Sequence, residues 1–194
     1  LSPIVPHDII YSGKTSQDKK KMVCEVLKQN DEHAVVLSSP ESIAWLLNIR
    51  GADVPRTPLP LSFVILNRDG RISLFTDTRK ITNLVSAHLG NAVSVFPFKD
   101  IGKQLKSSIE SQMKIRIDLK SNPTWFEQYI KKSNGIVSYG DDPITGLKAV
   151  KNPVELKGTR NAHVNDAICC SRCIFSRAVT SSLNCFSRAC SSRS

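Results

Sequence analysis

The sequence of 194 residues lacks any apolar run that approaches the ~18 residues a membrane span needs. It also lacks a secretory signal, because residues 1–7 are short and interrupted by proline. No segment is repeated along the chain. We therefore expect no membrane span, a cytoplasmic location, and one domain with or without an appendage, long enough to bury a core. The absence of an initiator methionine suggests a fragment, so a lost targeting segment stays open.

Recognisable catalytic motifs are missing as well. The sequence has no His-Glu-x-x-His pair and no Gly-x-Ser-x-Gly turn. None of the four histidines, His7, His33, His88 and His163, has a partner at ligand or catalytic spacing, so each is predicted to be structural. Cys24 lies within an apolar helix face and is predicted to be a small buried hydrophobic residue.

Aromatic residues are few, whereas the net charge is +10. Such a charge invites a nucleic-acid interpretation. However, the basic residues are dispersed apart from Lys19–Lys21, which we expect at the solvated start of a helix, and no aromatic residue alternates with them on an expected strand. Nucleic acid is therefore an unlikely partner. An acidic partner domain or acidic peptides would account for the charge equally well, and a stand-alone basic binding module is kept as the alternative.

Hydrophobic periodicity predicts helices and strands in alternation. Thr15 is expected to cap a first helix, and residues 1–13 are expected to be an irregular opening segment. Asp69-Gly70 predicts the turn of a β-hairpin, and the alternating strand at 115–119 is expected to have one wet face or to lie at an edge. Further helices are predicted at residues 39–48, 79–89, 99–113 and 123–131, and strands at 34–37, 63–66, 72–75, 92–96, 115–119 and 136–139. This order indicates an α/β fold with a mixed sheet.

The stretch from Ser39 to Pro60 combines a helix, its end and a proline-rich loop. Ser39 and Pro40 suit the start of a helix, which is expected to end near residues 48–51, where Gly51 can take a positive φ. Three prolines within residues 55–60 then force an extended passage.

Two charged residues, Arg50 and Asp53, flank this glycine, where packing alone would require neither. Two interpretations are open. Arg50 covers free carbonyls at the helix end while Asp53 pairs nearby, or a rigid loop presents Arg50 to something outside the domain.

The run IAWLLNIRGADV at residues 43–54, with the proline loop and the strand after it, closely resembles the second domain of Xaa-Pro aminopeptidase (aminopeptidase P). That family belongs with prolidase and creatinase among the pita-bread proteins. Residues 149–163 look like the linker into its catalytic domain. The resemblance implies a creatinase-type N-terminal domain at 14–151, with a six-stranded mixed sheet and helices on both faces. A linker helix over 152–166, capped by Asn152, is expected to follow.

In the family, an N-terminal residue is released from peptides with proline second, and two manganese or zinc ions activate a bridging water. Two Asp, one His and two Glu of the C-terminal domain hold those ions. None of the matching motifs is present in this sequence, so we expect no catalytic residue, metal ligand or cofactor in this chain, and no peptidase activity.

The resemblance leaves this domain a supporting role in active-site shape and dimerisation. Its expected partners are a pita-bread catalytic domain and a second copy of the chain. The loop with Trp45, Arg50 and Asp53 is expected to face the catalytic domain or a substrate end. Arg50 would hold a carboxylate by a bidentate contact, with Trp45 packed beneath it.

Residues 167–194 depart from the family. They hold five of the six cysteines and four arginines, but no Asp, Glu, Gly or Pro. This composition suggests translation in the wrong reading frame, or an unrelated tail on a truncated enzyme. A zinc site or disulfides among Cys169, Cys170, Cys173, Cys185 and Cys190 are the less favoured interpretations.

Overall fold

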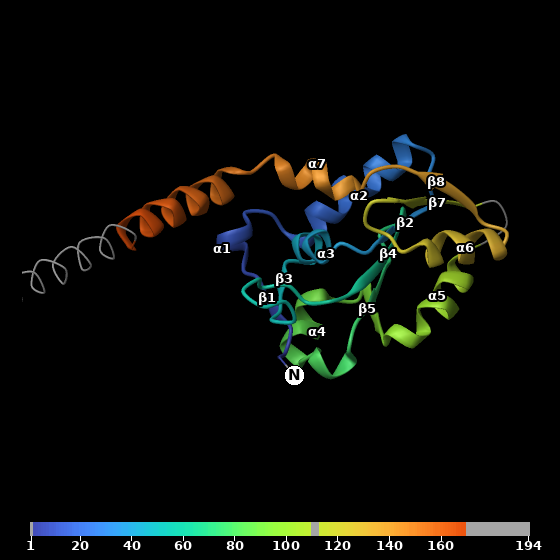
Figure 1. Cartoon of the computed structure of the whole chain (residues 1–194), viewed down its shortest axis with the longest axis horizontal. Helices are drawn as coiled ribbons and strands as arrows, with labels where there is room; N and C mark the ends of the chain where they lie inside the picture. The colour runs from blue at the N-terminus through green and yellow to red at the C-terminus, as the bar shows by residue number, and fades with distance from the viewer. Residues whose placement is uncertain (1, 110–112, 170–194) are drawn as a thin grey trace, which may run out of the picture. The chain divides into compact units, whose positions relative to one another are not determined.

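A computed structural model describes residues 2–109 and 113–169, which divide into two compact units between Lys151 and Asn152 (Figure 1). The strands of the first unit are β1 (Val5–Pro6), β2 (Ala34–Leu37), β3 (Ile49–Arg50), β4 (Phe63–Asn67), β5 (Ile72–Phe75), β6 (Val93–Phe96), β7 (Lys114–Ile117) and β8 (Ile136–Tyr139). Its helices are α1 (Ile9–Ser12), α2 (Ser16–Gln29), α3 (Pro40–Leu47), α4 (Asn83–Leu89), α5 (Ile101–Ser108), α6 (Thr124–Lys132) and α7 (Pro143–Ala149), with 3-10 turns η1 (Thr78–Lys80) and η2 (Phe98–Asp100).

Six strands form one mixed sheet in the order β6-β5-β4-β2-β7-β8, which confirms the predicted α/β fold. The β4–β5 hairpin and the β2–β4 pair are antiparallel, and the other three pairs are parallel. A second, two-stranded sheet joins β1 to β3. The opening segment was expected to be irregular, but it contains β1 and α1. Two-residue strands are too short to leave a periodic pattern in the sequence.

Helices cover both faces of the main sheet and enclose two hydrophobic clusters. Side chains from α2, α3, α4 and α7 pack on one face, and side chains from α5 and α6 pack on the other. The central strand β2 supplies Val35 and Leu37 to the first cluster and Ala34 and Val36 to the second, and all four residues are buried. The apolar run at 34–37 therefore marks a strand covered on both faces, as predicted.

Strand β7 was expected to lie at an edge or to have one wet face. The edge position is wrong, whereas its burial does alternate, with Ile115 and Ile117 buried and Lys114 and Arg116 partly exposed. It lies between β2 and β8, and its polar face carries a buried ion pair. Arg116 Nη1 lies 3.0 Å from Glu32 Oε2, with side chains 15% and 3% exposed. The Ser138 hydroxyl of β8 donates to the other Glu32 oxygen at 2.8 Å. The alternation was correctly recognised, but the sequence does not show that an acid 84 positions away neutralises the arginine.

Two predicted helices are shorter than expected. The pattern at 79–89 divides into η1 and α4, because the Thr82 hydroxyl caps a new helix by accepting from Val85 N at 3.3 Å. The spacing of Ile81, Leu84, Val85 and Leu89 predicts one apolar face, but Leu84 is 68% exposed. The helix predicted at 99–113 becomes η2 and α5, which ends at Ser108, and residues 110–112 lie outside the described part.

Helix α7 was not predicted, although Asp142 caps it and Pro143 opens it.

The second unit begins with a helix over residues 153–169. Asn152 Oδ1 accepts from the backbone of Val154 and of Glu155, both at 3.0 Å. The Glu155 carboxylate accepts from Asn152 N at 2.9 Å. This reciprocal capping box is the predicted helix start. Cys169 is exposed, and the other cysteines of the tail, with the metal and disulfide interpretations, lie outside the described residues.

Candidate functional site

The loop after α3 is held at its first residue by asparagine rather than glycine. Asn48 takes the left-handed conformation, with φ 50° and ψ 54°, and its N–H bonds Ala44 O. Gly51, which was expected to take a positive φ, is needed for close approach instead. A Cβ at Gly51 would lie 2.8 Å from Pro60 Cβ. The loop therefore packs backbone against backbone at this glycine.

The proline passage is not simply extended. Thr57 N donates to Val54 O at 3.1 Å, and Arg56 between them has φ 63°, so the chain turns back. Gly51 N then bonds Pro58 O at 3.2 Å, and Asp53 N bonds Leu59 O at 3.2 Å. Residues 51–60 thus form a short, internally bonded loop.

Arg50 lies half-buried at the base of this loop. Its Nη1 donates to Ile49 O at 2.9 Å and to Ala44 O at 3.4 Å. The guanidinium thus covers carbonyls at the end of α3, as the first interpretation predicted. No carboxylate of the described residues pairs with it, and burial lowers the pKa of Arg50.

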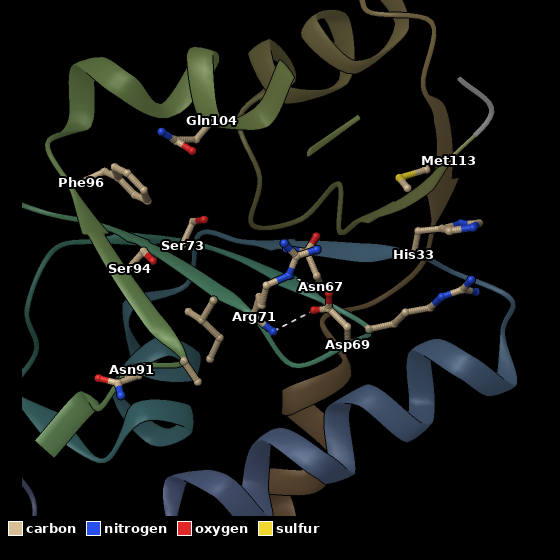
Figure 2. Close-up of a pocket in the computed structure, with 13 residues that line it drawn as sticks. His33, Asn67, Asp69, Arg71, Ser73, Asn91, Ser94, Phe96, Gln104 and Met113 are labelled. Carbon is tan, nitrogen blue, oxygen red and sulfur yellow. Dashed lines mark hydrogen bonds and ion pairs between the residues drawn. The ribbon is translucent and has the colours of Figure 1, made fainter. Parts of the chain in front are cut away.

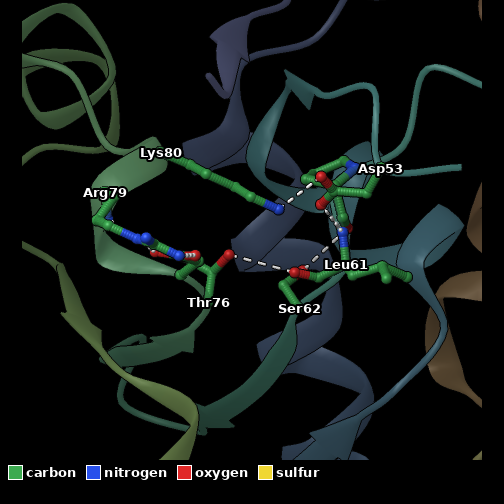
Figure 3. Close-up of polar contacts among 8 residues, drawn as sticks. Asp53, Leu61, Ser62, Thr76, Arg79 and Lys80 are labelled. Atoms are coloured by element: carbon green, nitrogen blue, oxygen red, sulfur yellow. Dashed lines mark hydrogen bonds and ion pairs between the residues drawn. The ribbon is translucent and has the colours of Figure 1, made fainter. Parts of the chain in front are cut away.

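Asp53 turns inward and is fully engaged (Figure 3). Its Oδ1 lies 2.5 Å from Lys80 Nζ, with both side chains largely buried, and its Oδ2 accepts from Leu61 N at 2.7 Å. The Thr76 hydroxyl donates to Leu61 O at 3.2 Å. Burial alone would raise the pKa of Asp53, but Lys80 and the Leu61 N–H together hold it below its ordinary value. Asp53 therefore fastens the loop to the turn η1.

Trp45 lies against Lys19, a residue that was expected to be solvated and is only 1% exposed. The Lys19 ammonium donates to Trp45 O at 3.0 Å and to Asn48 Oδ1 at 2.6 Å, and lies 4.4 Å from the centre of the Trp45 ring. Asn48 Nδ2 in turn donates to Lys14 O at 2.9 Å. A buried lysine from α2 thereby fixes the end of α3. No local pattern distinguishes Lys19, because it stands in a run of three lysines. Packing of Trp45 beneath Arg50 stays a prediction.

The histidines have separate surroundings. His7 stacks on Tyr11 with ring centres 5.7 Å apart, His33 Nδ1 accepts from Lys114 N at 3.2 Å, and His88 Nε2 lies 3.0 Å from Leu47 O. Within residues 2–109 and 113–169, no group of three His, Cys, Asp or Glu side chains is placed to hold a metal ion. The described residues therefore do not supply a dinuclear site, which the resemblance assigns to a C-terminal domain.

A polar hollow of about 430 Å³, which the sequence did not indicate, lies beside the β4–β5 turn (Figure 2). Ser73 and Ser94 project from neighbouring strands, and Gln104 comes from α5. The charge of Arg71 is neutralised by Asp69, 2.7 Å away. The lining offers hydrogen bonds but no paired nucleophile and base.

A six-stranded mixed sheet with a loop fixed by internal contacts defines an α/β scaffold domain. The family described as Creatinase/Prolidase N-terminal domain matches residues 1–155, so the chain belongs to that family. No described helix has the length and apolar character to cross a membrane.

Similar proteins bear related names. Xaa-Pro aminopeptidase 1 of Dictyostelium discoideum is 32% identical over 158 residues, covering 81% of this chain and 25% of that protein. A probable Xaa-Pro aminopeptidase P of Coccidioides posadasii is 31% identical over 169 residues, which cover 84% of this chain and 28% of that protein. The chain thus spans about a quarter of the length of these relatives.

Solved structures agree on the fold. The X-prolyl aminopeptidase of Caenorhabditis elegans, described as a cytosolic enzyme with a di-nuclear active site, superposes with a TM-score of 0.76 at 27% identity, covering 86% of this chain and 28% of that one. The Xaa-Pro dipeptidase of Bacillus anthracis, at 13% identity, has a TM-score of 0.53 and supports the fold alone.

Proposed function

We propose that this chain is a non-catalytic domain of a cytoplasmic Xaa-Pro aminopeptidase, which supports the shape of the active site and dimerisation of the whole enzyme. The observation that carries the proposal is the family match over residues 1–155, an N-terminal domain in its family's description. The enzyme it serves would release the N-terminal residue from peptides with proline second. The two metal ions would be held by a catalytic domain and not by the residues described above.

The first test is an assay of the purified 194-residue chain on Ala-Pro-Phe with added Mn²⁺ or Zn²⁺. We expect no release of alanine, while the C. elegans enzyme cleaves the same peptide in parallel. Release that co-elutes with the chain on gel filtration and stops on addition of a chelator would overturn the proposal.

We further propose that the loop containing Trp45, Arg50 and Asp53 faces the catalytic domain or a substrate end. Arg50 would pair with a carboxylate there. The support is its half-buried guanidinium, which contacts carbonyls but no carboxylate of the described residues. Asp53 and Trp45 would hold the loop in place, since Lys80 and Lys19 already engage them.

A chimaera tests the role of Arg50. Residues 2–155 would replace the matching segment of the C. elegans enzyme, with Arg50→Gln compared against Arg56→Gln, an exposed arginine on the same loop. We expect Arg50→Gln to lower kcat/KM about 10- to 100-fold, the strength of a charged hydrogen bond, with little change for the control. Equal kinetics in the two variants would contradict the assignment.

We also propose that residues 167–194 are read in a shifted frame. Translation of the coding DNA in all three frames from His163 onward tests this directly. Asp, His and Glu ligands in another frame would support the proposal, and their absence from every frame would refute it.

A further inference from the structure

A hollow between α5 and α6 combines exposed aromatic surface with positive charge. It has a volume of about 740 Å³. Its lining consists of Lys106, Trp125, Gln128, Tyr129, Lys132, Ser133 and Asn134. We call it the α5–α6 hollow. It lies on a different part of the first unit from the Arg50 loop.

The aromatic part of the hollow is held by ring contacts. Trp125 is 43% exposed, yet its ring is fixed by two neighbours. The Tyr129 ring lies 4.9 Å away at 31°, and the Phe126 ring lies 5.1 Å away at 76°. Phe126 belongs to the buried cluster under the sheet. A fixed, half-exposed indole loses little entropy on binding, which is typical of the residues that anchor an interface.

The charge at the hollow is uncompensated within the described chain. Lys106 and Lys132 are exposed, as is Lys103 one turn away on α5, and no described carboxylate pairs with any of them. The single acid within α5 and α6 is Glu127. Lys131 Nζ at 2.7 Å and the Tyr139 hydroxyl at 2.6 Å already engage it. The hollow therefore presents a positive rim to whatever enters.

These features favour an acidic peptide over a nucleic acid. Binding a single strand requires a series of open ring faces on which successive bases stack. Here Tyr129 is half-buried against Trp125, so a single ring, the half-exposed Trp125, is open to the hollow. A peptide could place one apolar side chain beside Trp125 while its carboxylates reach the lysines. Such a ligand matches both the shape and the charge of the hollow.

We infer that the α5–α6 hollow binds a peptide segment in which glutamates flank one or two large apolar residues. The probe is a fluorescein-labelled peptide, Glu-Glu-Leu-Glu-Phe-Glu-Glu, titrated with the full chain in 50 mM and 300 mM NaCl. Matched probes replace its glutamates by glutamine, or its Leu and Phe by alanine. An oligouridylate of similar charge tests nucleic acid.

The double variant Lys106→Gln/Lys132→Gln should weaken binding about tenfold at low salt, and Trp125→Ala should weaken it by at least about tenfold. The controls Lys20→Gln/Lys21→Gln, with the same charge change on α2, and Tyr11→Ala, another exposed ring, should leave affinity unchanged. Circular dichroism checks that each variant is folded. Both substituted peptides should bind more weakly, and 300 mM salt should reduce binding of the parent.

Other outcomes overturn the inference. These are no binding of the parent peptide, equal losses in the α2 control, tighter binding of the oligouridylate than of the peptide, or concentration-dependent self-association that the Trp125→Ala change abolishes.

Discussion

At the scale of single residues, the least expected feature is Lys19, because a lysine is rarely buried without specific partners. Its ammonium donates to Trp45 O and Asn48 Oδ1 and faces the Trp45 ring. Replacing Lys19 by methionine keeps the apolar stem but leaves those buried acceptors without this donor. We expect the free energy of unfolding to fall by about 2–4 kcal/mol.

Urea denaturation followed by tryptophan fluorescence measures the loss. The control is Lys21→Met, an exposed lysine on the same helix, which should change stability by less than about 0.5 kcal/mol. If the two variants were equally stable, the buried contacts of Lys19 would contribute nothing.

Asp53 gives a pH-dependent prediction at the same scale. Its pKa lies below the ordinary 3.8 in the folded chain, through Lys80 and the Leu61 N–H. The stability that Asp53 contributes is therefore present above pH 3.8 and is lost as the pH falls through the lower, folded pKa. Asp53→Asn should be less stable than the parent by about 2 kcal/mol at pH 7.

Unfolding curves at pH 7, 5, 4 and 2.5 test this directly. The difference between parent and variant should hold from pH 7 to pH 5 and decrease as the pH falls below 3.8, the ordinary pKa. A difference independent of pH would show that the carboxylate charge plays no part.

At the scale of elements, the Glu32–Arg116–Ser138 contacts join the start of β2 to β7 and β8. Removing one charged partner leaves the other buried alone, so Glu32→Gln and Arg116→Met should each cost about 3–5 kcal/mol. The double variant Glu32→Met/Arg116→Met should recover part of that loss, because it leaves no unpaired charge. A double-mutant cycle in urea measures the coupling, and strictly additive losses would mean that the pair is not coupled.

Periodicity and turn chemistry were enough to predict most elements. The Asp69-Gly70 hairpin, the Thr15 cap and the buried run 34–37 are decided by neighbouring residues, and all three are confirmed. What the sequence could not reveal depends on distant partners. Lys19 meets Asn48 29 positions away, and Asp53 meets Lys80 27 positions away. The start of α7 is also local, because Asp142 caps the helix and Pro143 opens it.

The candidate loop shows the same division. Neighbouring residues are enough to predict the helix before the loop and the end of that helix. The internal contacts agree with the first interpretation, in which Arg50 covers carbonyls at the helix end and Asp53 pairs nearby. The left-handed residue was misassigned to Gly51, because glycine is the usual choice there and Asn48 is the less frequent one.

At the scale of the whole molecule, the chain carries a net charge of +10. Nine ion pairs within the described part of the chain engage lysines and arginines on several elements. We therefore expect the chain to elute from immobilised duplex DNA and RNA below about 150 mM NaCl, since few phosphate contacts are available. Retention beyond about 500 mM would instead support a nucleic-acid function.

The strand order also sets a sequence of assembly during synthesis. Four neighbouring strands, β6-β5-β4-β2, are complete once residue 96 has left the ribosome, whereas β7 and β8 emerge later. Until β7 arrives, the nascent sheet ends at β2, whose four residues are all apolar. An unpaired apolar edge of this kind pairs readily with other chains. A strand that is central in the finished domain is thus an aggregation-prone edge while the chain is being made.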